Sequence, residues 1–263
     1  MIGRCGAAAL EAVLPWTCLA CGRIQGGPGL CAACWSRMPW IAPPQCVRCG
    51  TPFDVGAGNA ARGRICAACA GRPPVVAATR AALRYDAASR GLVLGFKHAD
   101  RLHGAPVFAD WLRRAGADLL PGAGLIAPVP LHWSRLAWRR YNQAAVLARH
   151  VAARSEVPCA VDLLVRRRRT PSQGDLSREG RRRNVAGAFA IGRRWRDRLS
   201  GRRIILVDDV ITSGATLAAC ARVLLDGGAA AVDGLAIAQV VDPVGADLHP
   251  GSAAPTDLSS TLP

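Results

Sequence analysis

Short apolar runs alternate with amphipathic stretches along most of the chain. Four runs, each five or seven residues long, have the length and composition of strands: 79–85, 125–129, 203–207 and 235–241. Three stretches between them carry apolar residues at helical spacing: 103–120, 142–153 and 217–225. Strands that alternate with helices favour a parallel sheet with helical crossovers. We therefore predict an α/β domain, a parallel sheet flanked by helices, whose ligand binds at the carboxyl ends of its strands.

The first 69 residues differ from the rest of the chain, because cysteine motifs dominate them. Of the eleven cysteines in the chain, eight form four Cys-x-x-Cys pairs: Cys18/Cys21, Cys31/Cys34, Cys46/Cys49 and Cys66/Cys69. Such a pair points both sulfurs at one tetrahedral ion, and four cysteines leave no position open for catalysis. The alternative, a disulfide framework, needs an oxidising compartment. We predict two structural zinc ions, and we interpret Cys5, Cys159 and Cys220 as small buried or incidental residues.

A glycine follows the second cysteine of the first and third pairs, at Gly22 and Gly50. Glycine lets the backbone turn tightly enough for amide N–H groups to point at sulfur. The motif Cys-x-x-Cys-Gly, spacer, Cys-x-x-Cys therefore occurs twice. This repeat favours sequential grouping, with one ion for each repeat. A crossed arrangement, in which alternate pairs share an ion, stays open.

The sequence contains no apolar run close to the roughly 18–20 residues that a membrane span requires. Residues 1–16 are interrupted by Glu11 and lack a basic region followed by a long apolar one. We therefore expect a short N-terminal helix, no signal peptide and a cytoplasmic location.

Two proline pairs mark the organisation of the chain. The pair at 43–44 separates the two cysteine repeats, and the pair at 73–74 marks the exit from them. Residues 243–263 are polar and rich in small residues and proline. We predict an N-terminal helix with a double zinc ribbon (1–74), the α/β domain (75–242) and a disordered tail (243–263).

Segment 204–217 carries the most specific motif, Ile-Ile-Leu-Val-Asp-Asp-Val-Ile-Thr-Ser-Gly-Ala-Thr-Leu. A buried strand delivers Asp208 and Asp209 to the sheet edge, where two carboxylates can accept hydrogen bonds from paired ribose hydroxyls. The following loop, at a helix N-terminus, suits a phosphate. We predict that these loop residues bind it: Thr212, Ser213, Gly214, Ala215 and Thr216. An ordinary capped helix rarely needs two acids and three hydroxyls, and the Walker and Gly-x-Gly-x-x-Gly motifs are absent.

This segment resembles the signature with which type I phosphoribosyltransferases bind 5-phosphoribosyl 1-pyrophosphate (PRPP). Other segments, and the cysteine-rich start, resemble the ComF family of competence-associated proteins over residues 10–242. The matching positions outside the motif are 128–131, Arg135, Arg139, Arg140, 141–144, Thr170, Gln173, Arg178, Arg182, Asn184, Val185, Ala188 and Phe189. Tyr141 is a mild departure, since the family pattern there is Gly-Phe-Asn or similar.

The resemblance implies a phosphoribosyltransferase-like sheet in which the loop after 125–129 holds pyrophosphate. The candidate pyrophosphate ligands are Arg135, Arg139, Arg140 and Lys97, the only lysine of the chain. The resemblance also implies that Mg²⁺ accompanies PRPP and that residues 166–184 form a mobile hood, a segment that closes over the substrate. It further implies that Asp208 and Asp209 are the catalytic residues if the protein is an enzyme.

The charge distribution fits anionic ligands. The net charge is +16, and the segment 166–203 holds 14 arginines against three acidic residues. Such a field attracts phosphates, pyrophosphate or a nucleic-acid backbone, although a solvated basic loop is the alternative. Only Phe189 and Trp195 are aromatic in this segment, so it offers no evident platform on which bases could stack.

Two functions follow from these observations. The first is a PRPP-binding protein of the ComF type that handles incoming single-stranded DNA in the cytosol during natural transformation, with competence proteins as partners. The second is a catalytic phosphoribosyltransferase of nucleotide or salvage metabolism, whose acceptor the sequence does not identify.

Overall fold

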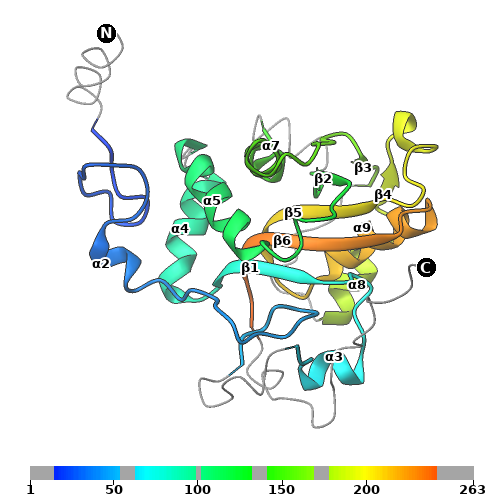
Figure 1. Cartoon of the computed structure of the whole chain (residues 1–263), viewed down its shortest axis with the longest axis horizontal. Coiled ribbons are helices and arrows are strands. Elements are labelled where there is room, and N and C mark those ends of the chain that lie inside the picture. Colours follow the sequence, from blue (N-terminus) through cyan, green and yellow to red (C-terminus); the bar gives the residue numbers. More distant parts are fainter. Residues whose placement is uncertain (1–14, 54–62, 99–101, 132–140, 169–177, 242–263) are drawn as a thin grey trace, which may run out of the picture.

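A four-stranded parallel sheet lies at the centre of the computed structural model, which describes residues 15–53, 63–98, 102–131, 141–168 and 178–241 (Figure 1). The strands stand in the order β1-β6-β5-β2. Their bounds are β1 Thr79–Arg84, β2 Leu125–Pro128, β5 Arg203–Ile211 and β6 Ala231–Gln239. All three neighbouring pairs are parallel. The predicted α/β class with a parallel sheet is confirmed.

Helices cover both faces of this sheet (Figure 1). Alternate residues of β5 face opposite ways: Ile205 lies in one hydrophobic core and Leu206 in the other, as the two-residue period of a strand requires. The first core is covered by α4 Ala87–His98, α5 Ala105–Ala115 and α7 Gln143–Ser155. The second is covered by α8 Arg178–Val185 and α9 Ala215–Asp226.

The cysteine-rich module lies along the free edge of β1. Its backbone bonds that edge, with Ile41 N–H donating to Ala82 O at 3.0 Å and Thr79 N–H donating to Arg48 O at 2.6 Å. This pairing explains why β1 is buried along almost all its length. The remaining short elements are α2 Ala32–Trp35, α3 Ala67–Gly71, η2 Leu102–Gly104, β3 Leu164–Arg166, β4 Phe189–Ile191 and η3 Arg193–Trp195.

The predicted end of the third strand was wrong. The sequence placed it at Val207, but β5 continues to Ile211 because β6 keeps pairing with it, Asp208 opposite Ala236 and Ile211 opposite Gln239. The predicted helix 103–120 was also too long, since α5 ends at Ala115. Helix α4, the antiparallel strand pair β3–β4 and helix α8 were not predicted as elements. Within the described residues, no helix combines the length and apolar character needed to cross a membrane.

A buried ion pair anchors the amino ends of two strands. Asp233 is fully buried, accepts a hydrogen bond from Ala78 N–H at 3.0 Å and pairs with Arg203 Nε at 2.5 Å. We expect Asp233→Asn to lower the free energy of unfolding by about 1–2 kcal/mol, because Arg203, whose side chain is 38% exposed, would lose its charged hydrogen-bond partner. Chemical denaturation measures this. The exposed Asp226→Asn is the control, and an equal effect of both changes would contradict the prediction.

Candidate functional site

The acidic pair lies near the carboxyl end of β5. Asp209 N–H donates to Asp208 Oδ1 at 2.9 Å, and Val210 N–H donates to Asp209 Oδ1 at 2.8 Å. The second oxygen of Asp209 forms an ion pair with Lys97 Nζ at 2.9 Å. Lys97 is on α4, so the structure brings a predicted pyrophosphate ligand into contact with the predicted acidic pair. The side chains of Lys97 and Asp209 are 30% and 14% exposed, which leaves this pair within reach of a ligand.

Asp208 has an unusual ionisation. Burial, followed by the neighbouring charge of Asp209, raises the pKa of Asp208 well above its ordinary value, although Lys97 acts in the opposite direction. Two carboxylates this close disfavour double ionisation. Asp208 therefore retains a proton to higher pH than an ordinary aspartate, and it can donate as well as accept a hydrogen bond.

The loop between β5 and α9 offers donors to an anion. Gly214 precedes the helix with φ +69°, a conformation that glycine adopts without strain. The first turn of α9 contains no acidic residue, and its backbone N–H groups favour negative charge. The hydroxyl oxygen of Ser213 is buried and has no hydrogen-bond partner among the described residues. A ligand oxygen would satisfy a group that is otherwise costly to bury.

A cavity of about 290 Å³ opens beside this loop. Its walls come from two parts of the chain, since the loop residues 211–215 face Cys49, Cys66 and Cys69 of the cysteine-rich module. The described lining residues include three arginines, Arg72, Arg182 and Arg222, and no aspartate or glutamate. The cavity therefore suits an anionic ligand, and the second cysteine cluster forms one of its walls.

Some of the site residues predicted from the sequence line the cavity or contact the acidic pair, and other residues that were not predicted line the cavity too. Thr212, Ser213, Gly214 and Ala215 line the cavity, and Lys97 contacts the acidic pair. The predicted pyrophosphate ligands Arg135, Arg139 and Arg140 lie outside the described residues. Arg182, from the predicted hood, is in α8 and reaches the cavity.

Sequence reasoning missed Arg72 and Arg222. Arg222 had a usable signal, because it is the only charged residue in the helical stretch 217–225. Arg72 follows the last cysteine pair by three positions and has no such signal.

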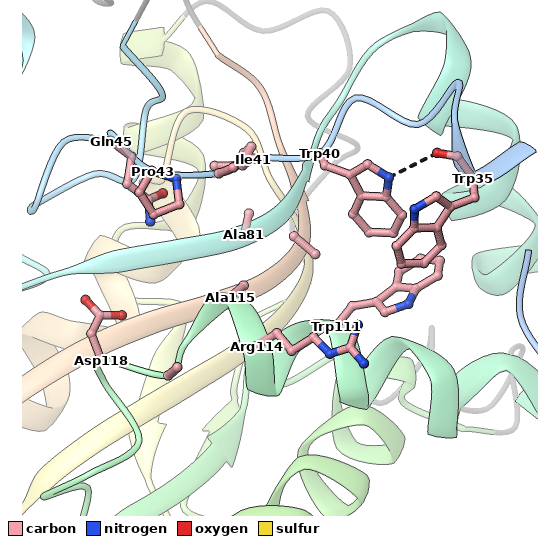
Figure 2. Close-up of a pocket in the computed structure, with 13 residues that line it drawn as sticks. Trp35, Trp40, Ile41, Pro43, Gln45, Ala81, Trp111, Arg114, Ala115 and Asp118 are labelled. Atoms are coloured by element: carbon pink, nitrogen blue, oxygen red, sulfur yellow. Dashed lines mark hydrogen bonds between the residues drawn. The ribbon is translucent and has the colours of Figure 1, made fainter. Parts of the chain in front are cut away.

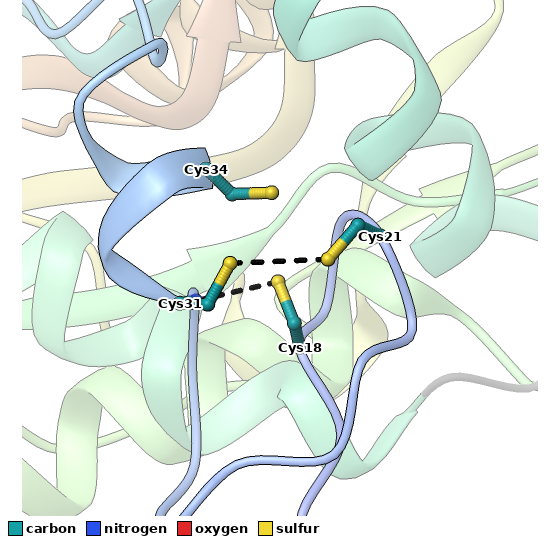
Figure 3. Close-up of side chains that lie close together, drawn as sticks. All are labelled: Cys18, Cys21, Cys31 and Cys34. Atoms are coloured by element: carbon teal, nitrogen blue, oxygen red, sulfur yellow. Dashed lines mark hydrogen bonds between the residues drawn. The ribbon is translucent and has the colours of Figure 1, made fainter.

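The eight paired cysteines form two clusters. The sulfurs group sequentially, as Cys18, Cys21, Cys31, Cys34 and as Cys46, Cys49, Cys66, Cys69, and within each cluster they lie within 4.8 Å of one another. Figure 3 shows the first cluster, in which the four side chains point at a common centre. This grouping answers the question that the sequence left open between sequential and crossed pairs.

The geometry of both clusters fits zinc. Zn–S bonds of about 2.3 Å in a tetrahedron place sulfurs roughly 3.8 Å apart, and the Cys21–Cys31 and Cys49–Cys66 sulfur pairs are 3.8 Å and 3.6 Å apart. Backbone N–H groups donate to sulfur, from Cys31 to Cys18 at 3.3 Å and from Cys66 to Cys46 at 3.3 Å. In the turn that ends in Gly50, Cys49 N–H donates to Cys46 Sγ at 3.5 Å. The double zinc ribbon is confirmed, and the clusters are consistent with two structural zinc ions.

Thiol ionisation supports the same conclusion. Burial raises the pKa of Cys18, but hydrogen bonds from the backbone of Cys21 and Cys31 lower it to about 6. The hydrogen bond to Cys31 raises the pKa of Cys34 to about 12. Neighbouring thiols compete for protons in this way when no cation compensates their charge. A divalent ion removes the conflict by holding all four as thiolates.

Gly50 links the second cluster to the sheet. It has φ +69°, and a Cβ atom there would lie 2.5 Å from Thr79 O. We expect Gly50→Ala to destabilise the protein by about 1–2 kcal/mol through its backbone conformation and by about 1–3 kcal/mol more through the clash. Gly22 has φ +73° with nothing within 4 Å of such a Cβ, so Gly22→Ala should show only the first effect. Thermal unfolding of the zinc-loaded variants measures both, and equal losses would contradict this account.

Comparison with known proteins matches both parts of the chain. A model of the double zinc ribbon domain matches residues 9–70, and a model of the phosphoribosyl transferase domain matches residues 142–243. A solved structure, orotate phosphoribosyltransferase from Aeropyrum pernix, overlaps 60% of this chain and 80% of its own with 19% identity and a TM-score of 0.34. The two family matches and the strand order establish the fold.

Two named relatives are similar in sequence to this chain, one over most of its length and the other over about a third of it. The DNA utilization protein YhgH of Escherichia coli (strain K12) is 31% identical over 213 residues, which cover 78% of this chain and 87% of that protein. Competence protein F of Haemophilus influenzae is 40% identical over 93 residues, which cover 35% of this chain and 40% of that protein.

Proposed function

The chain belongs to the ComF/YhgH family, and from this premise we propose that it binds PRPP or a related phosphoribosyl ligand while it handles incoming single-stranded DNA in the cytosol during natural transformation. The observation that carries the proposed ligand is the acidic pair with Lys97, which lies next to the loop 212–216. In this loop the buried Ser213 hydroxyl has no partner among the described residues, and the loop lines a cavity with three arginines. The names of the two relatives, a DNA utilization protein and a competence protein, support the role in DNA handling.

In this proposal each group of the site has a separate task. Asp208 and Asp209 bind the two ribose hydroxyls, and the loop 212–216 binds the 5′-phosphate through its N–H groups and hydroxyls. Lys97 stands where it can attract the pyrophosphate once the ligand displaces it from Asp209. Mg²⁺, bound with the pyrophosphate, would supply positive charge there, and carboxylate oxygens such as those of Asp209 are the donors it prefers.

A ligand series tests the binding proposal. Isothermal titration of the zinc-loaded protein with PRPP, ribose 5-phosphate, ribose and pyrophosphate should give the highest affinity for PRPP with Mg²⁺. Ribose 5-phosphate should bind more weakly, and ribose should not bind measurably. Equal affinity for pyrophosphate and PRPP would mean that a basic surface, not a phosphoribosyl site, captures the ligand.

Catalysis is a second candidate function, favoured by the raised pKa of Asp208. A protonated carboxyl next to an ionised one can exchange a proton with an acceptor during transfer of the phosphoribosyl group. Release of pyrophosphate from PRPP, measured over a panel of nitrogen bases and amines, tests this. Release that stays at background with every acceptor, while PRPP still binds, would leave the binding function and reject the enzymatic one.

A further inference from the structure

A second cavity lies apart from the acidic pair and the loop 212–216. It measures about 510 Å³ and lies between the cysteine-rich module and the α/β domain. Residues 35–45 form one side, and β1 with the end of α5 forms the other, as Figure 2 shows. Its volume is within the range of about 300–1,000 Å³ that is typical of ligand pockets.

Three tryptophans form one wall of this cavity (Figure 2). The ring centroids of Trp35 and Trp40 are 4.2 Å apart, and Trp111 stands edge-on to Trp40 at 4.9 Å. Trp40 Nε1–H donates to the backbone oxygen of Trp35 at 3.1 Å, which fixes the ring of Trp40 against the Trp35 backbone. Trp35 remains 42% exposed. The result is a rigid aromatic wall that keeps an accessible face, and such a wall favours a flat ring.

The polar groups of the cavity indicate what else the ligand carries. Gln45 Oε1 is buried and has no hydrogen-bond partner among the described residues, so a ligand that donates an N–H there would satisfy it. Figure 2 shows Gln45 across the cavity from the tryptophans. An aliphatic or aromatic protein side chain could fill the space but would leave this oxygen without a donor. A flat ring with an N–H edge meets both requirements.

The rim of the cavity is positive. Arg114 lines it, and so does Asp118, whose carboxylate is already paired with Arg80 at 2.6 Å. That ion pair cancels the one negative charge among the described lining residues and leaves the guanidinium of Arg114 for an anion. A phosphate attached to the flat ring would lie within this field.

We propose that this cavity binds a nucleobase of single-stranded DNA, with the base against Trp35 and Trp40, its N–H edge at Gln45 and its phosphate at Arg114. A nucleobase combines a flat ring, N–H donors and an attached phosphate. The aromatic platform that the basic segment lacks is thus assembled from positions far apart in the sequence. The choice of DNA as the source of the base rests on the function proposed above. The fit of the cavity to a nucleobase does not depend on that function.

Fluorescence anisotropy with a labelled oligothymidylate, and with an abasic oligonucleotide of the same length, tests this proposal. Trp35→Ala should weaken binding of the oligothymidylate by roughly five- to a hundredfold and leave binding of the abasic strand unchanged. Trp35→Phe should restore much of the affinity. Trp16→Ala is the matched control, because Trp16 is 38% exposed and does not line the cavity. Each variant should still hold two zinc ions, which excludes damage to the first ribbon next to Cys34.

A second pair of variants separates the charge from the ring. Arg114→Ala should weaken binding of both strands and reduce its dependence on salt, whereas Arg113→Ala, at the adjacent exposed position outside the cavity, should have a smaller effect. Equal losses from Trp35→Ala and Trp16→Ala, or equal wild-type affinity for the two strands, would overturn the proposed site while DNA binding itself stands. Binding of thymidine monophosphate to the wild type, without binding of either strand, would contradict the role in DNA handling and assign the cavity to a free nucleotide.

Discussion

Replacement of Cys46 by serine is expected to remove one of two zinc ions and to weaken PRPP binding by roughly tenfold or more, about 1.4 kcal/mol. Cys46 is fully buried, and its sulfur accepts hydrogen bonds from the backbone N–H groups of Cys49 and Cys66. A structural zinc site contributes directly to folding, so the second ribbon should lose its order without the ion. This ribbon forms a wall of the cavity beside the loop 212–216, and the loop would lose that wall.

The first cluster provides the matched control for this experiment. Cys18 is also a buried member of a four-cysteine cluster, but its cluster does not line the cavity beside the loop 212–216. Cys18→Ser should therefore also lower the zinc content from two ions to one, yet change PRPP affinity much less. Elemental analysis gives the zinc content, and calorimetry gives the affinity. If both substitutions weakened PRPP binding equally, the second ribbon would have no special part in the site.

The second large effect concerns Asp208, whose replacement by asparagine should stabilise the protein while it removes ligand binding. Burial raises the pKa of this carboxyl above its unfolded value of 3.8. A group with a raised folded pKa contributes stability that is fully present below the unfolded pKa and is lost as pH rises through the folded pKa. At neutral pH the wild type therefore bears the cost of a partly buried carboxyl beside the charge of Asp209, which the amide avoids.

This account predicts a pH-dependent difference between the two proteins. The melting temperature of Asp208→Asn should exceed that of the wild type at neutral pH by at least about 2 °C, roughly 1 kcal/mol for a chain of this size. The difference should grow from about pH 4 upward and then level off. Asp226→Asn, at an exposed position on the following helix, should not change with pH in this way. A variant that is less stable than the wild type at neutral pH would show that the carboxyl has a structural function.

The sequence predicted the features that depend on local patterns. Four Cys-x-x-Cys pairs within 69 residues favoured zinc strongly, because two thiolates at this spacing can both reach one tetrahedral ion. The strand, acidic pair and Thr-Ser-Gly loop likewise follow one another in the chain, so their order alone placed them at a sheet edge. The end of β5 was wrong because pairing with β6, a tertiary contact, extends the strand through residues as polar as Asp208.

Features built from distant segments could not be predicted in the same way. Lys97 was one of several cations near the predicted site, and only the packing of α4 against β5 places it at Asp209. The cavity beside the loop needs Arg72 from one module and Arg222 from the other. The tryptophan wall joins Trp35, Trp40 and Trp111 across more than 70 residues of sequence, and no short-range pattern connects them.

The most direct test of the central claim, that the acidic pair and the loop 212–216 form a phosphoribosyl site, is calorimetric titration of PRPP into the wild type and into the double variant Asp208→Asn/Asp209→Asn. Both proteins should hold two zinc ions. The wild type should bind PRPP in a Mg²⁺-dependent way, and the double variant should lose this affinity by at least roughly a hundredfold, about 2.7 kcal/mol. Absence of binding to the wild type, or equal affinity of the two proteins, would contradict the claim.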